Sequence, residues 1–115
     1  KPTLEQVKSV LVGVASAKKR VVSVKKLMEV VSDFYNITTE DLLKQSRRKE
    51  FVKPRQVAMF LMREQLENSF PSIGDHFGGR DHTTVMHAVD KISKLMSEKE
   101  SLKQEIDLIV NKLYM

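Results

Sequence analysis

The stretch "GGRDHTTVMHAVDKI", residues 78–92, joins two glycines to a run of five polar side chains and then to a regular apolar pattern. Just before it, Ser69 can cap a very short helix over residues 71–77. The two glycines break that helix, and Asp81 stands where a second helix would be capped. A short helix, a tight turn containing glycine and a longer helix form the layout of a helix-turn-helix.

The apolar residues of the second helix recur at three- and four-residue spacing, which places them on one helical face. The face toward the core would carry Val85, Ala88, Val89 and Ile92. The opposite face would carry Thr83, Met86, His87 and Asp90. In a helix-turn-helix the first residues of the second helix face the major groove of DNA. We therefore expect residues 80–84 at an exposed helix N-terminus, where unpaired N–H groups and the helix dipole attract phosphate.

Helical spacing and capping residues recur along the rest of the chain, and no stretch alternates as a strand does. Further helices are predicted to open at Thr3, Ser23, Thr38, Pro54 and Ser101, with a left-handed stop at Asn36. The sequence thus predicts an all-α fold: a small helical domain over residues 23–115, built around the helix-turn-helix, with an N-terminal linker helix over residues 1–22. The apolar stripe of residues 102–113 favours packed core, and a partner-binding face is the alternative.

The charge of the chain is concentrated in one segment. The formal net charge is +5, and residues 44–55, "KQSRRKEFVKPR", hold six basic residues and one acidic residue. The whole imbalance therefore lies in this basic loop, which is typical of an element that binds a polyanion. A solvated surface loop stays open as the alternative.

Composition excludes several classes of protein. Hydrophobic residues make up 41% of the 115 residues, enough for a core, and cysteine is absent. Disulfides and cysteine-based metal sites are therefore excluded. No apolar run approaches the roughly 18 residues of a membrane span, and the N-terminus does not resemble a signal peptide. Because residue 1 is Lys rather than Met, we expect a piece of a longer chain.

The polar run has side chains that suit DNA. Arg80 can bind a phosphate or a guanine edge, and His82 can donate to or accept from a base edge. The methyl group of Thr83 suits the methyl group of thymine, whereas Thr84 and His87 are better placed for phosphates. Asp81 could accept from a cytosine amino group, although capping its own helix is the favoured interpretation. On the alternative interpretation, Asp81 caps the helix and the other residues of the run are only polar surface side chains.

Two long stretches carry a family resemblance. "FPSIGDHFGGRDHTTVMHAVDKI" and, upstream, "DLLKQSRRKEFVKPRQVAMFLMRE" resemble the C-terminal DNA-binding domain of the DnaA family of bacterial replication initiators. The resemblance covers about residues 24–96. Residues 3–23 resemble the helix that connects the family's ATPase module to this domain.

The resemblance implies sequence-specific binding to double-stranded DNA at origin boxes of the type TTATNCACA. Nothing in the sequence requires a symmetric dimer, so we expect one monomer per site. Base contacts would come from Asp81, His82 and Thr83 in the major groove and from Arg47 in the minor groove. Contacts to phosphates would come from Arg48, Arg55, Gln56, Arg63, Pro71, Arg80, Thr84 and His87. Because Gln45, Ser46 and Glu50 interrupt the arginines of the loop, the minor-groove role could fall to Arg48 instead.

Catalytic motifs are absent from the sequence. It has no G-x-x-x-x-G-K-[ST] loop, and its three histidines lack the spacing of a metal site. We expect no enzyme activity, cofactor or metal in this chain, with ATP bound only by an ATPase module outside it.

The resemblance also implies a cytoplasmic protein of the bacterial nucleoid that needs no membrane. It would meet other initiator subunits through modules outside this chain, and regulatory proteins are possible partners. Two other classes stay open: a helical protein-interaction domain, and a non-specific nucleic-acid or membrane binder that uses the basic loop alone.

Overall fold

The computed structural model describes residues 22–45 and 47–115. The expected linker helix over residues 1–22 lies outside this part, apart from its last residue, and stays a prediction. The helices of the described part are α2 (Val24–Phe34), α3 (Thr39–Leu43), α4 (Lys49–Glu64), α5 (Phe70–His76), α6 (His82–Glu98) and α7 (Glu100–Leu113). The described residues form no strand, so the prediction of an all-α fold is confirmed.

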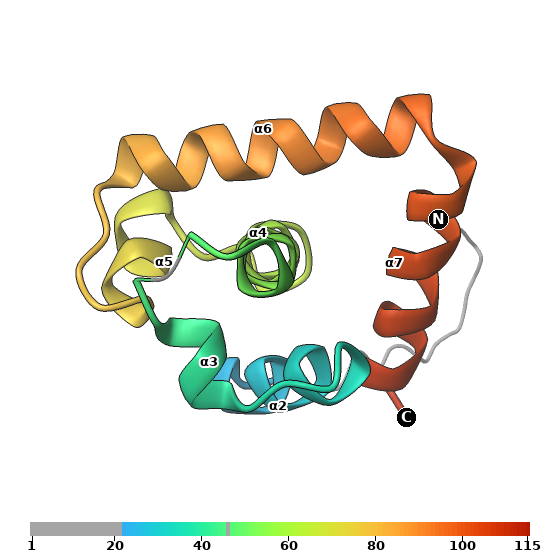
Figure 1. Ribbon diagram of the computed structural model, residues 1–115, viewed down its shortest axis with the longest axis horizontal. Helices are drawn as coiled ribbons and strands as arrows, with labels where there is room; N and C mark the ends of the chain where they lie inside the picture. Colours follow the sequence, from blue (N-terminus) through green and yellow to red (C-terminus); the bar gives the residue numbers. More distant parts are fainter. Residues whose placement is uncertain (1–21, 46) are drawn as a thin grey trace, which may run out of the picture.

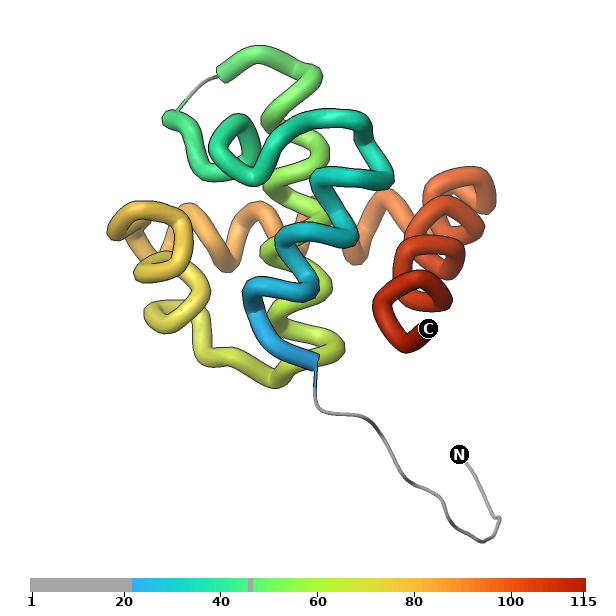
Figure 2. The backbone as a smooth tube through the Cα atoms, turned by 90° about the horizontal axis from the view of Figure 1, so that it is seen from below, coloured from blue at the N-terminus to red at the C-terminus, as the bar shows by residue number. Residues whose placement is uncertain are grey.

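Helix α4 is the centre of the fold. Figure 1 looks along α4, with α6 on one side, α2 and α3 on the opposite side, and α5 and α7 at the two ends. Figure 2 shows α6 crossing α4 at a steep angle. All six consecutive residues 57–62 of α4 are buried, because α2, α3, α5 and α6 all pack against this helix. The core therefore surrounds α4 and fixes α6 against it.

Local capping signals place most helix ends where the sequence predicts them. The hydroxyl of Ser23 accepts from the Lys26 N–H at 3.1 Å and starts α2. Thr38 forms a reciprocal capping box with Asp41 at the start of α3. Asn36 takes the left-handed conformation, with φ of 59°. These predictions are confirmed because each depends on contacts within one helical turn.

The prediction that α4 begins at Pro54 is wrong. The helix begins at Lys49, and the Arg48 carbonyl accepts from the N–H groups of Phe51 and Val52 at 3.0 and 2.9 Å. Pro54 is buried inside the helix, where it removes one hydrogen bond from the second turn. Half of the expected basic loop is therefore helical, which holds its later basic side chains in fixed positions.

Helix α7 packs as core, as its apolar stripe predicts, but its N-cap is Lys99, two residues before the expected cap at Ser101. Its buried residues are Leu102, Ile106, Ile109 and Leu113. Lys99 is the sole residue between α6 and α7. On the α7 side that faces α2 and α4, the Glu105 carboxylate accepts from the Tyr35 hydroxyl at 2.5 Å and from the Lys53 ammonium at 3.3 Å. This cluster ties three helices together.

Alkaline pH is expected to weaken this cluster. Burial, and then the hydrogen bond to Glu105, raise the pKa of Tyr35 far above its ordinary value. A raised folded-state pKa gives stability that is complete below the unfolded-state pKa of about 10 and is lost as the pH rises above it. We expect the free energy of unfolding to fall above about pH 10, and to fall less in Tyr35→Phe.

Urea unfolding at a series of pH values measures this effect. Tyr114→Phe is the matched control, because the Tyr114 hydroxyl donates to the uncharged Gln65 side chain at 2.8 Å. If the free energy of unfolding fell equally with pH in the wild-type protein and in Tyr35→Phe, Tyr35 would not be the cause of the loss at alkaline pH.

Candidate nucleic-acid interface

One backbone carbonyl builds the turn between α5 and α6. The Gly74 oxygen accepts from the N–H groups of Phe77, Gly79 and Arg80 at 3.1, 3.0 and 3.0 Å. Gly78 and Gly79 both have positive φ, 80° and 82°, which glycine adopts without a steric penalty. A Cβ added to Gly74 would collide with the carbonyl oxygen of Arg80. The turn therefore depends on glycines, and it sets where α6 begins.

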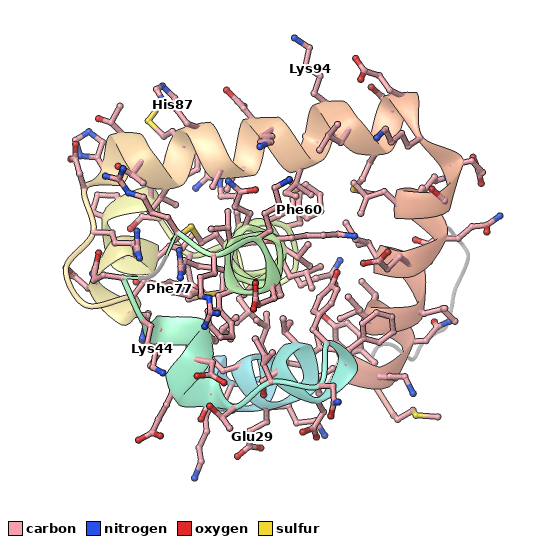
Figure 3. All side chains as sticks on the ribbon, in the orientation of Figure 1. Glu29, Lys44, Phe60, Phe77, His87 and Lys94 are labelled. Carbon is pink, nitrogen blue, oxygen red and sulfur yellow. The ribbon has the colours of Figure 1, made fainter. Side chains whose placement is uncertain are left out.

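The predicted division of α6 into two faces is confirmed. Val85, Ala88, Val89 and Ile92 are buried, whereas Thr83, Met86, His87 and Asp90 are exposed. Figure 3 shows Lys94, farther along α6, projecting away from the body of the protein. The polar N-terminal turn of α6 is thus presented to solvent on a helix whose other face is fixed in the core.

The predicted base readers lie together at this end of α6. Asp81, His82 and Thr83 are all exposed. Asp81 takes the N-cap position, and its carbonyl accepts from the Val85 N–H at 3.2 Å. Its side chain makes no capping hydrogen bond, so the favoured interpretation of this carboxylate as a cap is wrong. Because the carboxylate is turned toward His82, 3.4 Å from Nδ1, it leaves the first N–H groups of α6 unpaired by a side chain.

The basic loop meets this end of α6 through Arg80. The Arg80 Nη2 donates to the Lys44 carbonyl at 3.1 Å, a contact across 36 residues of sequence. Beside it, Gln45 Nε2 would lie 3.7 Å from a Cβ added to Gly78. The two segments that the sequence singles out therefore lie on one face of the protein.

Arg55 is placed where sequence reasoning did not expect it. Its side chain is buried, 5% exposed, and its Nε donates to the Leu42 carbonyl at 3.3 Å. Burial, and then the charge of Arg80, lower the pKa of Arg55. The Arg80 Nε is also buried and has no hydrogen-bond partner in the described part of the chain. Two neighbouring guanidinium groups repel each other, and an anion between them would relieve that repulsion.

A cleft of about 320 Å³ between α4 and α6 gathers five of the predicted phosphate contacts. These are Arg55, Gln56, Arg80, Thr84 and His87. Lys91 also lines the cleft, and the sequence analysis missed it. Its spacing was the available signal, since Lys91 lies four residues after His87 and seven after Thr84, on the same helical face.

The remaining predicted contacts lie outside the cleft. Arg63 donates to the Asn68 carbonyl at 3.1 Å, and its guanidinium lies 4.3 Å from the Phe70 ring centre. Pro71 is exposed in the first turn of α5. Arg47 and Arg48 are exposed in the basic loop, and Arg48 lies 3.8 Å from a carboxylate oxygen of Glu50. The contact roles of these four residues stay predictions.

The described residues contain neither a cluster of metal ligands nor a helix that could span a membrane. In that part of the chain, no three histidine or carboxylate side chains converge as a metal site would require. Over the same residues, no helix has the length and hydropathy needed to cross a membrane.

Comparison with known proteins gives consistent matches. Residues 24–92 match the family model described as the bacterial dnaA protein helix-turn-helix. The chain is 42% identical over 112 residues to the chromosomal replication initiator protein DnaA of Francisella tularensis subsp. tularensis, covering 97% of this chain and 23% of that relative. It is 44% identical over 103 residues to the protein of the same name from Limosilactobacillus reuteri, covering 90% of this chain and 23% of that relative.

A solved structure described as a DNA replication initiation factor also matches. The TM-score is 0.69 at 29% sequence identity, over 79% of this chain and 29% of the other. The chain thus spans about a quarter of the length of these relatives. The family model alone covers more than half of the chain. The chain therefore belongs to the bacterial DnaA helix-turn-helix family.

Proposed function

We propose that this domain binds double-stranded DNA sequence-specifically, at boxes of the type TTATNCACA, and so brings a replication initiator to its origin. The observation that carries the proposal is the contact between Arg80 and the Lys44 carbonyl, which joins the N-terminus of α6 to the basic loop. One protein face can then reach a major groove with α6 and the adjacent minor groove with the loop.

Each part of the face has a chemical task in this proposal. Asp81, His82 and Thr83 lie at the exposed end of α6 and would contact base edges. The cleft between α4 and α6 would hold backbone phosphates against its two guanidinium groups. Arg47 would enter the minor groove, because Arg48 already takes the N-cap position of α4 and lies near Glu50.

The proposed domain is a binding module, without catalysis of its own. Its relatives are about four times longer than the chain, so ATP and contacts to other initiator subunits would belong to their other modules. We expect one domain per box and a parent protein located at the bacterial nucleoid.

Thr83→Ala is the test of base reading. We expect this substitution to weaken the binding free energy for a box duplex by about 1–3 kcal/mol and to change binding to a scrambled duplex little. The reason is that the lost contact is to a base rather than to a phosphate. Fluorescence anisotropy on the two duplexes measures this difference.

Ser93→Ala is the matched control for this test. It removes a hydroxyl from the exposed side of the same helix, about 15 Å farther along the axis. It should leave both affinities unchanged. If Thr83→Ala lowered both affinities by the same factor, base reading by this residue would be wrong, and Thr83 would instead contact the DNA backbone.

A further inference from the structure

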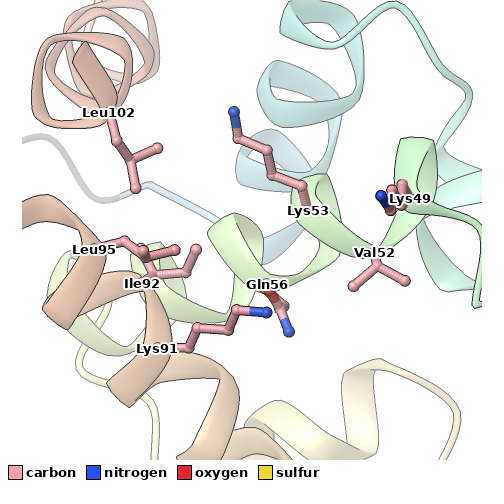
Figure 4. A pocket seen from close by; sticks show the side chains of 8 residues that line it. All are labelled: Lys49, Val52, Lys53, Gln56, Lys91, Ile92, Leu95 and Leu102. Carbon is pink, nitrogen blue, oxygen red and sulfur yellow. The ribbon is translucent and has the colours of Figure 1, made fainter. Parts of the chain in front are cut away.

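An apolar groove lies beside the proposed DNA face, where α4, α6 and α7 meet. Its volume is about 360 Å³, within the range of ligand pockets. Its apolar lining comes from three helices: Val52, Ile92, Leu95 and Leu102. Figure 4 shows Ile92, Leu95 and Leu102 grouped at one end of the groove.

The polar lining of the groove is basic. Lys49, Lys53 and Lys91 line it, and no acidic side chain does. Lys53 and Lys91 come from opposite sides, with Gln56 between them (Figure 4). The Lys53 ammonium is paired with a carboxylate oxygen of Glu105 at 3.2 Å. The ion pairs within residues 22–45 and 47–115 include neither Lys49 nor Lys91. Two lysines on different helices therefore lack a carboxylate partner in the described part of the chain.

We propose that this groove binds an acidic peptide segment of a partner protein, with one or two bulky apolar residues flanked by carboxylates. The apolar residues would enter between Ile92, Leu95 and Leu102, and the carboxylates would pair with Lys49 and Lys91. Because the lysines flank the groove on two sides, they match an apolar anchor that has charges on both sides. A lipid or fatty acid, with its charge at one end only, matches them less well.

The groove also adjoins the cleft between α4 and α6, so a ligand bound in the groove would affect the cleft. Val52, Gln56 and Lys91 line both. A peptide that pairs with Lys91 would withdraw that lysine from the cleft and would also cover Gln56. Resting on the proposed function, we infer that the acidic peptide and DNA compete for the domain.

A labelled peptide tests the groove without any DNA. The probe is fluorescein–Asp-Glu-Leu-Phe-Glu-Asp, and its control replaces Leu-Phe by Ser-Ser. We expect a Kd of about 10–100 µM for the probe and binding at least about tenfold weaker for the control, because the control buries no apolar side chain. Equal binding of the two peptides would overturn the proposal, since charge alone would explain it.

Charge reversals locate the site. Lys49→Glu should raise the Kd of the probe about tenfold or more, whereas Lys94→Glu, on the outward side of α6, should change it less than about twofold. Both lysines are exposed, and Lys49 is the first residue of α4, where a glutamate suits the helix dipole, so both variants should fold. An equal loss of probe affinity in the two variants would overturn the assignment of the peptide site to this groove.

Other occupants of the groove are tested with the same Lys49→Glu variant. A dimer in sedimentation velocity that Lys49→Glu abolishes would identify a second copy as the occupant and overturn the assignment to a partner peptide. Binding to phosphatidylglycerol vesicles that Lys49→Glu abolishes, without binding of the probe, would overturn it in favour of a lipid.

Competition between the peptide and DNA is measured as the Kd of the probe in the presence of duplex. Saturation with unlabelled box duplex should raise the Kd of the probe about tenfold, and an unchanged Kd would overturn the competition. If no duplex bound at all, the proposed function would fail, and the peptide measurement without DNA would still decide the groove.

Discussion

Gly74→Ala is expected to destabilise the domain by about 3 kcal/mol or more and to abolish specific DNA binding. The added Cβ would collide with the Arg80 carbonyl oxygen, which is backbone and cannot turn away as a flexible side chain could. Relief requires the turn to open, and opening lengthens the three hydrogen bonds that the Gly74 carbonyl accepts. The N-terminus of α6 would then lose its fixed place beside the basic loop.

Gly79→Ala is the matched control for this prediction. A Cβ at Gly79 meets nothing within 4 Å, so its cost is only the strain of a positive φ of 82°, about 1–2 kcal/mol. Urea unfolding followed by circular dichroism measures both variants. Equal losses would mean that the contact between Gly74 and Arg80 does not hold the turn together.

Arg55→Ala is expected to weaken DNA binding by about 2 kcal/mol on every sequence and to reduce the salt slope by about one. The reason is that a guanidinium in the cleft between α4 and α6 would contact phosphates, which are the same in every sequence, rather than base edges. The same change removes a buried side chain and the donor to the Leu42 carbonyl, so the domain should also lose about 1–3 kcal/mol of stability.

Titrations of box and scrambled duplexes at several salt concentrations test this prediction, at a temperature where the variant is folded. Lys94→Ala, which removes an exposed cation that points away from the body, serves as the control. A change in the ratio of the two affinities in Arg55→Ala would contradict a phosphate role for Arg55.

Sequence patterns were sufficient for the parts of the fold that depend on neighbouring residues. The caps at Ser23 and Thr38 and the two faces of α6 follow from spacing within a helical turn or two. The start of α4 does not, because Pro54 looks like a first-turn residue, whereas the helix begins five residues earlier and contains Pro54 as a buried residue. The direction of the Asp81 carboxylate is another such case, because His82 competes with the helix for it.

The sequence was sufficient to propose which residues form the candidate site, but not how they are arranged in space. The sequence indicates that Arg55 and Arg80 bind phosphate, but neither their proximity nor the burial of Arg55 is visible in it. Both depend on carbonyl groups of distant segments, Leu42 for Arg55 and Lys44 for Arg80. Lys91 was missed although its spacing from Thr84 and His87 places it on their helical face. The contact roles themselves stay predictions.

Sequence-specific DNA binding is tested most directly by fluorescence anisotropy of the wild-type domain on two labelled duplexes at about 0.15 M salt. One duplex carries TTATCCACA, and the other carries the same bases scrambled. Tighter binding to the intact box by about a hundredfold or more is the result we predict. Equal affinity for the two duplexes would contradict the account, because only the basic loop and the cleft would then be binding DNA.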